Sequence, residues 1–202
     1  MNRLARHASR LGLLGLLMSP TLVPASAGTL LIDDFGFGKD APNQNLSRVG
    51  TPWRVVTDNV MGGVSSAGMT FTRIADRPCL RLTGTVSLEN NGGFVQASLD
   101  LAADGGSFDA SPYAGIELDV YGNNESYNLH LRTADTWIVW QSYRAAFDAP
   151  PAWRTLRLPF SRFEPYRTGA PLDVHRLKRI GLVAIGREMQ ADLCLGHIAF
   201  YR

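Results

Sequence analysis

Glycine and proline interrupt this sequence so often that long helices have no room to form. Of the 202 residues, 20 are Gly and 11 are Pro, and they are scattered through the chain rather than gathered at its ends. Both residue types end helices and mark turns. With 45% hydrophobic and 19% charged residues, the chain is also too apolar for a disordered protein. The sequence therefore predicts an all-β domain built from short strands.

The N-terminus has the three parts of a secretory signal peptide. Arg3, Arg6 and Arg10 come first, the apolar run 11–18 follows, and the small residues at 25–27 complete it. We expect cleavage after this last segment and export to the periplasm or the exterior. A retained membrane anchor is the alternative, but the apolar run is far shorter than the ~20 residues that a spanning helix needs.

Removal of residues 1–27 would leave one domain, 28–202, and would change its charge. The leader holds three of the 20 basic residues and none of the 18 acidic ones, so the mature chain has a net charge of −1. A nearly neutral domain lacks the positive field that phosphate recognition requires. Nucleic acid is therefore not an expected partner, and no later segment is long and apolar enough to span a membrane.

The chain has two cysteines, Cys79 and Cys194. An exported protein can form disulfides, and two cysteines allow one intramolecular pairing. The alternative is two separate thiols. Neither cysteine has a second Cys or a His at zinc-ligand spacing, so we expect no metal at either.

Short β-rich segments separated by turn residues continue to the end of the chain. Their spacing predicts a two-sheet sandwich or jelly roll. The expected strands are 29–32, 53–56, 69–74, 79–88, 93–99, 113–121, 127–133, 137–147, 153–159, 180–185 and 193–201. Segment 180–185 is apolar at both parities, which indicates a central strand covered on both sides.

Alternation along the other strands predicts which side chains face the core. Ile116, Leu118 and Val120 share one face, as do Leu129 and Leu131. In the strand expected at 137–147 the same rule places Ile138 and Trp140 inward. The opposite parity gives a polar face with aromatic residues, made of Glu117, Asp119, Tyr121, Asn128, His130, Arg132, Val139, Gln141 and Tyr143.

Several patterns resemble catalytic or cofactor sites but lack the required context. The G-x-G-x-x-A string at 36–41 is followed by Pro42 rather than by a helix, so no dinucleotide cofactor is expected. Segment 63–68 misses the serine-hydrolase elbow by one position and leads into a strand. The pair Glu117 and Asp119 is interpreted as surface acids rather than as a glycosidase pair. We expect no enzyme and no cofactor.

Metal ligands are also sparse. His130, His175 and His197 lie far apart in the sequence and in no known ligand spacing. Asp33 and Asp34 at the end of the first strand could join carbonyl oxygens around a calcium ion, and the alternative is a solvated strand end. We favour the solvated end.

Four segments carry a resemblance to a known family. An Asn-Val-Met-Gly-Gly string lies at 59–63 and a Leu-Glu-Asn-Asn-Gly-Gly-Phe string at 88–94, and looser similarities cover 127–133 and 153–163. Together they resemble the complex I intermediate-associated protein 30 family over most of residues 30–202. The resemblance implies a galactose-binding-like jelly roll and a non-catalytic role. Eukaryotic members of the family help to assemble respiratory complex I in mitochondria.

The two specific strings supply one set of candidate binding residues. Their paired glycines suit turns that need positive φ or close backbone approach, and their short polar side chains can bond nearby backbone. The loops could brace one another or line a recognition surface, and both interpretations stay open. The set is Asp58, Asn59, Met61, Gly62, Gly63, Ser65, Ser66, Asn90, Asn91, Gly92 and Gly93.

The polar sheet face supplies the second set. Aromatic groups beside planar polar groups suit sugar recognition, although a merely solvated face has the same composition. The set is Tyr121, His130, Arg132, Trp137, Gln141 and Tyr143. The leading hypothesis is thus an exported binding or assembly-factor-like module with a protein partner. The alternative is a carbohydrate-binding module that uses the sheet face.

Overall fold

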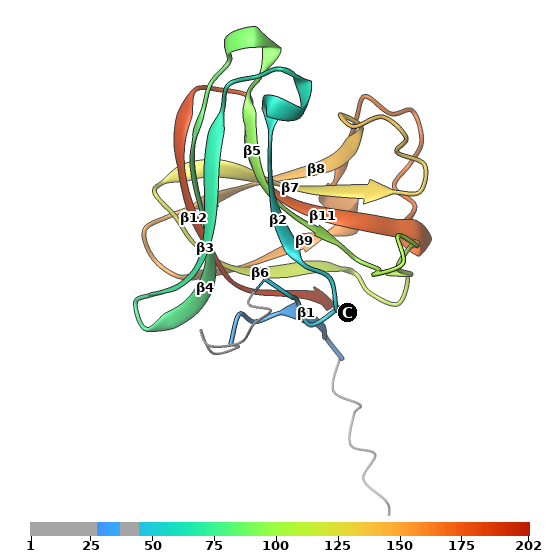
Figure 1. Ribbon diagram of the computed structural model, residues 1–202. Helices are drawn as coiled ribbons and strands as arrows, with labels where there is room; N and C mark the ends of the chain where they lie inside the picture. Colours follow the sequence, from blue (N-terminus) through green and yellow to red (C-terminus); the bar gives the residue numbers. More distant parts are fainter. Residues whose placement is uncertain (1–27, 37–44) are drawn as a thin grey trace, which may run out of the picture.

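The computed structural model describes residues 28–36 and 45–202, which form two facing antiparallel sheets (Figure 1). The expected leader, 1–27, and most of the G-x-G-x-x-A string lie outside the described residues. The all-β sandwich predicted from the strand spacing is confirmed. No helix in the described part of the chain is long and apolar enough to cross a bilayer.

The first sheet has the strand order β3-β4-β12-β6-β9, and β1 pairs with the end of β12. Its strands are β1 (Leu30–Asp33), β3 (Ser66–Ile74), β4 (Arg77–Val86), β6 (Gly115–Tyr121), β9 (Arg154–Pro159) and β12 (Met189–Tyr201).

The second sheet has the order β10-β8-β7-β11-β5-β2. Its strands are β2 (Trp53–Thr57), β5 (Phe94–Asp100), β7 (Glu125–Thr133), β8 (Ser142–Ala149), β10 (Glu164–Tyr166) and β11 (Leu177–Ile185). Single 3-10 turns interrupt the connections, namely η1 (Asp58–Met61), η2 (Glu89–Asn91), η3 (Phe160–Arg162) and η4 (Val174–Arg176).

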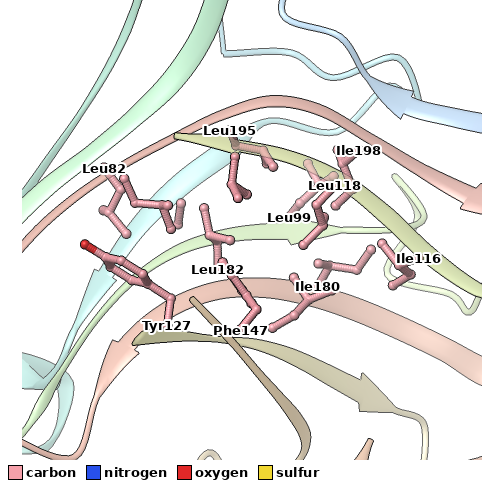
Figure 2. Packing of buried hydrophobic residues seen from close by; sticks show 14 of the residues in the cluster. Leu82, Leu99, Ile116, Leu118, Tyr127, Phe147, Ile180, Leu182, Leu195 and Ile198 are labelled. Atoms are coloured by element: carbon pink, nitrogen blue, oxygen red, sulfur yellow. The ribbon is translucent and has the colours of Figure 1, made fainter. Parts of the chain in front are cut away.

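The core lies between the sheets, where alternate residues of each strand meet. Figure 2 shows Ile180 and Leu182 of β11 packed toward Leu118, Leu195 and Ile198 of the first sheet, all fully buried. The predicted inward parity of β6 and β7 is therefore confirmed. The central position of β11 is confirmed too, since Val183 on its other face is also buried.

A bulge in β12 lets that strand follow the core along its whole length. Leu195 pairs with Val120, but His197 pairs with Asp119, so Gly196 is the extra residue. Inward side chains therefore change from odd positions before the bulge to even positions after it. A Cβ at Gly196 would lie 2.8 Å from the Trp153 ring, so only glycine fits there.

Two expectations about strands are wrong. The strand expected at 137–147 begins at Ser142, because residues 137–141 form a turn before β8. The strands β6 and β7 follow each other in sequence, yet they lie in different sheets. Their outward side chains therefore belong to opposite surfaces of the sandwich, not to one face. A further three-residue strand, β10, has no counterpart among the expected strands.

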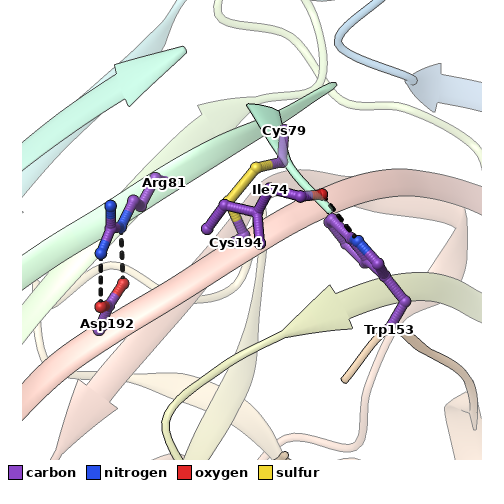
Figure 3. The surroundings of a disulfide bond; sticks show 6 residues. All are labelled: Ile74, Cys79, Arg81, Trp153, Asp192 and Cys194. Carbon is purple, nitrogen blue, oxygen red and sulfur yellow. Dashed lines mark hydrogen bonds and ion pairs between the residues drawn. A yellow bond between two sulfur atoms is a disulfide. The ribbon is translucent and has the colours of Figure 1, made fainter. Parts of the chain in front are cut away.

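Cys79 of β4 and Cys194 of β12 form a disulfide on the outer side of the first sheet (Figure 3). Their Cα atoms are 5.6 Å apart and 115 positions separate them in sequence. Beside the disulfide, Arg81 Nε and Nη2 bind the Asp192 carboxylate at 2.8 and 2.7 Å. The bond thus joins two adjacent strands that are distant in sequence.

Replacing both cysteines by alanine should lower the free energy of unfolding by about 2–5 kcal/mol, because the unfolded chain regains the entropy of a long open loop. Urea denaturation of the variant beside the wild type measures the difference. Wild type in reductant is the control and should match the variant. Two reactive thiols in denatured, unreduced wild type would contradict the disulfide.

Candidate functional site

The two glycine-rich loops meet at one buried carboxylate, Asp58. The 3-10 turns η1 and η2 lie at the same end of the sandwich, at the top of Figure 1. Asp58 Oδ1 accepts a hydrogen bond from Ser65 N at 3.0 Å, and Oδ2 accepts from Gly93 N at 2.6 Å and Phe94 N at 3.3 Å. The Ser65 hydroxyl also donates to Oδ2. A single side chain therefore fixes both loops.

The ionised form of Asp58 is the form that these donors stabilise. Burial by itself raises the pKa of the carboxyl, but the hydrogen bonds from Ser65, Gly93 and Phe94 outweigh it and hold the pKa below its usual value. The side chain is 0% exposed. It thus remains a buried anion whose oxygens are occupied by protein donors.

Glycine is required where the backbone approaches this carboxylate. A Cβ at Gly63 would lie 2.4 Å from Asp58 Cγ, and one at Gly92 would lie 2.5 Å from Asp58 Oδ2. Gly62 and Gly93 have φ values of 90° and 130°, which side chains rarely adopt. The paired glycines therefore belong to the architecture of the loops.

The other loop residues of the predicted set face solvent. Asn59 is exposed, and its amide nitrogen, in the orientation that satisfies the network, donates to Gly63 O at 2.7 Å. Asn90 and Asn91 adopt left-handed backbone, with φ of 54° and 58°. The outward residues are Asn59, Met61, Ser66, Asn90 and Asn91, whereas Asp58 and Ser65 are buried.

Apolar side chains also project from these loops. Val60, Met61, Val64 and Leu88 are all exposed, Val60 at 69%. Of these, only Met61 is in the predicted set, because the sequence argument weighed polar groups and glycines. The sequence feature that could have identified these residues is an apolar side chain within a polar, turn-forming segment.

The predicted sheet-face set divides between two surfaces. Tyr121 lies on β6 of the first sheet, where its ring packs edge-on against Trp153 at a centroid distance of 5.8 Å. His130 and Arg132 lie on β7 of the second sheet. The expectation that Tyr121 shares their face is therefore wrong, because the chain changes sheet between β6 and β7.

Tyr143 is in the core, so its predicted place on the polar face is also wrong. It pairs with Leu131, whose side chain points inward, and it is fully buried. Its hydroxyl donates to Ala170 O at 3.1 Å or Pro171 O at 3.0 Å. The parity error follows from counting the alternation through the turn at 137–141.

Arg132, Trp137 and Gln141 do come together, at the turn between β7 and β8. Arg132 Nη2 donates to Thr136 O at 2.7 Å and to Ile138 O at 3.1 Å. Gln141 Oε1 accepts from Ile138 N at 3.1 Å, and its Nε2 donates to Arg167 O at 3.1 Å. Two polar side chains therefore fix the backbone of this turn.

The turn that they hold presents four large apolar side chains to solvent. Trp137 is 84% exposed, and Ile138, Val139 and Trp140 are exposed as well. We call residues 137–140 the tryptophan turn. The predicted inward positions of Ile138 and Trp140 are wrong, because no strand continues through them. Exposed aromatic groups on a fixed backbone are typical of recognition surfaces.

A hollow lies on the outer face of the second sheet, over β7 and β8. Its volume is about 350 Å³, and its lining residues are Asn128, Arg144, Ala146, Arg162 and Glu164. Arg144 lies over the Tyr166 ring, 3.4 Å from its centroid. Tyr166 pairs with Ser142, the first residue of β8 after the tryptophan turn. The tryptophan turn, the Tyr166 ring and the hollow therefore follow one another along β8. We call these three features together the β8 strip.

His130 lies on the same outer face with an unused ring nitrogen. It pairs with Arg144 of β8 and follows Asn128 on the outward side of β7. Its Nε2 is buried and without a hydrogen-bond partner, and the residue is 8% exposed. Burial, helped by the positive charge of Arg144, lowers the pKa of His130 to about 3, so the ring is neutral at neutral pH.

Arg132 lines a second hollow, of about 230 Å³. Its other lining residues include Asp100, Thr133, Thr136 and Arg179. Asp100 is already bound by Arg54 and Arg179, and the Arg179 Nε distance is 2.6 Å. Its charge is therefore balanced within the protein.

The other acidic candidates are bound by protein groups. Asp33 is buried and accepts from Trp53 Nε1 at 2.8 Å, so the expected solvated strand end is wrong for this residue. Asp34 pairs with Arg48 at 3.0 Å. Glu117 and Asp119 pair with Arg157 and Arg77 respectively. Within residues 28–36 and 45–202, no group of three or more His, Cys, Asp or Glu side chains is arranged to hold a metal ion.

Comparison with known proteins agrees with this architecture. The family model for complex I intermediate-associated protein 30 matches residues 40–195. No curated protein matches the chain. Among solved structures, the chain is similar to the family 11 carbohydrate-binding module of the cellulosomal cellulase Lic26A-Cel5E of Clostridium thermocellum, with a TM-score of 0.66, 13% identity, and coverage of 88% of this chain and 96% of that one.

Two further structures have the same fold. One is the family 11 module from Clostridium thermocellum in complex with a β-1,3-1,4-mixed-linked tetrasaccharide, with a TM-score of 0.65, 13% identity, and coverage of 88% and 97%. The other is a family 30 carbohydrate-binding module, with a TM-score of 0.51, 14% identity, and coverage of 70% and 75%. These likenesses show the two-sheet β-sandwich fold.

Asp58→Asn should lower the free energy of unfolding by about 2–4 kcal/mol, because an amide nitrogen replaces an oxygen that faces backbone N–H groups. The difference should be largest near neutral pH. Because the folded-state pKa of Asp58 is lowered, its contribution is present above the unfolded value, about 3.9, and is lost as pH falls through the folded value. Urea denaturation across pH measures both effects.

Ser66→Ala is the matched control for this variant, since Ser66 lies next to the network but is exposed. Its stability should stay within about 0.5 kcal/mol of wild type. Equal stability of Asp58→Asn and Ser66→Ala at neutral pH would show that the carboxylate does not hold the loops.

Proposed function

The chain belongs to the complex I intermediate-associated protein 30 family, and from that premise we propose that it is an exported, non-catalytic binding module whose ligand is a glycan. The observation that carries the proposal is the tryptophan turn, where exposed aromatic side chains stand on a backbone fixed by Arg132 and Gln141. Exposing so much apolar surface is unfavourable in water unless a ligand covers it.

The β8 strip has the length and chemistry to bind several sugar units. From Ser142 to Ala146 it extends about 13 Å along the strand, given the rise of each residue. The Tyr166 ring lies under Arg144, which lines the hollow together with Asn128, and the exposed Trp137 belongs to the turn that precedes β8. Such an arrangement fixes the orientation of a polar ligand while the rings bury its apolar faces.

The similar solved structures support the same interpretation. A family 11 module with this fold was solved in complex with a β-1,3-1,4-mixed-linked tetrasaccharide. We extend that chemistry to the present chain as a proposal, with the β8 strip as the binding surface. Export, which we propose from the leader-like residues 1–27, would place the module where polysaccharides occur, and the disulfide suits such an oxidising location.

A second candidate function is docking to a protein partner, as the family description suggests for an assembly-associated protein. The observation that favours it is the exposed apolar group Val60, Met61, Val64 and Leu88 on the loops that Asp58 fixes. This surface is separate from the β8 strip, so variants can test the two candidates independently.

Trp137→Ala should weaken glycan binding by about tenfold or more, which corresponds to about 1.4 kcal/mol, because it removes the most exposed ring of the strip. Affinity electrophoresis in gels containing different soluble polysaccharides, followed by calorimetry on the best ligand, measures the change. Thermal unfolding should be unchanged, because the side chain packs against little.

The matched control is Val60→Ala, which removes exposed apolar surface at the loops instead. It should leave glycan binding unchanged and should weaken binding to a co-purified protein partner if the second candidate is correct. Equal glycan affinity for Trp137→Ala and wild type, or no retention of the wild type by any polysaccharide, would overturn the proposed glycan site.

A further inference from the structure

Four arginines near the β8 strip have no acidic partner. Eight other arginines in the described residues form ion pairs with Asp or Glu, namely Arg48, Arg54, Arg77, Arg81, Arg157, Arg176, Arg179 and Arg187. In contrast, no described carboxylate lies within ion-pair distance of Arg132, Arg144, Arg162 or Arg167. Arg73, Arg154 and Arg202 form no ion pair either, but they belong to the first sheet or follow its strand β12, so four of the seven unpaired arginines in the described residues lie near the β8 strip.

Neutral groups hold these guanidinium groups in place. Arg132 binds the carbonyls of the tryptophan turn, and Arg162 Nη2 donates to Ala146 O at 2.9 Å. Arg144 Nε donates to Ser142 Oγ at 3.0 Å while the group lies over the Tyr166 ring. Arg167 lies over the same ring at 5.5 Å. The side chains are thus positioned without loss of their charge.

The surroundings penalise this charge as it stands. Burial lowers the pKa of Arg144, Tyr166 offsets part of this effect, and the nearby Arg167 adds to it. Burial likewise lowers the pKa of Arg132, and Arg179 adds to the effect. A lowered arginine pKa means that the cation is less stable than it is in water. A bound anion would reverse this penalty.

The hollow of the β8 strip is where such an anion fits. Arg144 and Arg162 both line it, and the planar guanidinium is suited to a carboxylate. Glu164 is the one acid in the lining, and it pairs in register with Arg144 without forming an ion pair.

We propose that the glycan recognised by the β8 strip is acidic, and that Arg144 and Arg162 bind the carboxylate of a uronic acid unit. The inference rests on the proposed glycan-binding function and specifies its substrate class. The rings of Trp137 and Tyr166 supply the apolar contacts, as they would for any sugar. The carboxylate pairing selects charged polymers over neutral ones, because a neutral ligand leaves the guanidinium groups without a counter-charge.

The first test changes the ligand and keeps the protein unaltered. Polygalacturonate and its fully methyl-esterified form have the same backbone, but the ester has no charge. The full-length mature chain should bind the acid form at least about tenfold more tightly, and added salt should weaken that binding. Neutral mixed-linkage β-glucan and dextran sulfate are included as further ligands.

The outcomes separate this inference from the proposed function. Equal or tighter binding of the methyl ester or the neutral glucan would overturn the acidic class and would keep glycan binding. Equal binding of dextran sulfate would overturn the carboxylate assignment, because any anion would then suffice. No binding to any of the four polymers would overturn both proposals.

The second test changes the protein. Arg144→Gln with Arg162→Gln should lower affinity for polygalacturonate at least about tenfold and should flatten its salt dependence. Arg73→Gln with Arg154→Gln is the matched control, since it removes the same charge from strands of the first sheet. If both pairs weaken binding equally, the effect is one of net charge and the assigned site is wrong. Circular dichroism and melting confirm that each variant folds.

Discussion

Burial of one face of each sheet is the constraint on which the rest of this structure depends. Ile116 and Leu118 of β6 meet Ile180 and Leu182 of β11 between the sheets, and alternation then sends their neighbours outward. Outward residues of the first sheet include a disulfide and several ion pairs, so many of their polar groups are satisfied within the protein. Outward residues of the second sheet include Arg144, which lines a hollow and has no ion-pair partner. The two outer surfaces therefore differ in what they can still bind.

The Asp58 network has a different role from the β8 strip, although both include residues that sequence motifs single out. Its donors are the backbone of the opposite loop and the Ser65 side chain, and they occupy both oxygens of the carboxylate. A Cβ at Gly63 or Gly92 would collide with it. The most specific strings of the family thus encode the way in which two loops are joined, and any recognition at this end must use the side chains around them, such as Val60 and Leu88.

Alternation and turn residues predict the sandwich, the inward faces of β6 and β7, and the central position of β11, because each depends on local sequence. They fail where the answer depends on non-local geometry. The change of sheet between β6 and β7 separates Tyr121 from His130, and no local pattern marks it. The turn at 137–141 has strand-like composition, yet Arg132 and Gln141 bind its backbone and end the alternation before Tyr143. The pairing of Asp58 with Gly93 is likewise invisible to periodicity.

The unbalanced charge on the β8 strip is difficult to explain as a device for stability. An arginine that only covers apolar surface gains nothing from losing its counter-ion, and a nearby acid would lower the cost of desolvating it. The fold supplies such acids elsewhere, since Asp100 of β5 binds Arg54 and Arg179 on the two adjacent strands, β2 and β11. At Arg144 the position across the strand pair is Glu164, yet the guanidinium lies over Tyr166 instead. Because Glu164 forms no ion pair with Arg144, the Arg144 guanidinium stays available to a ligand where the hollow opens to solvent.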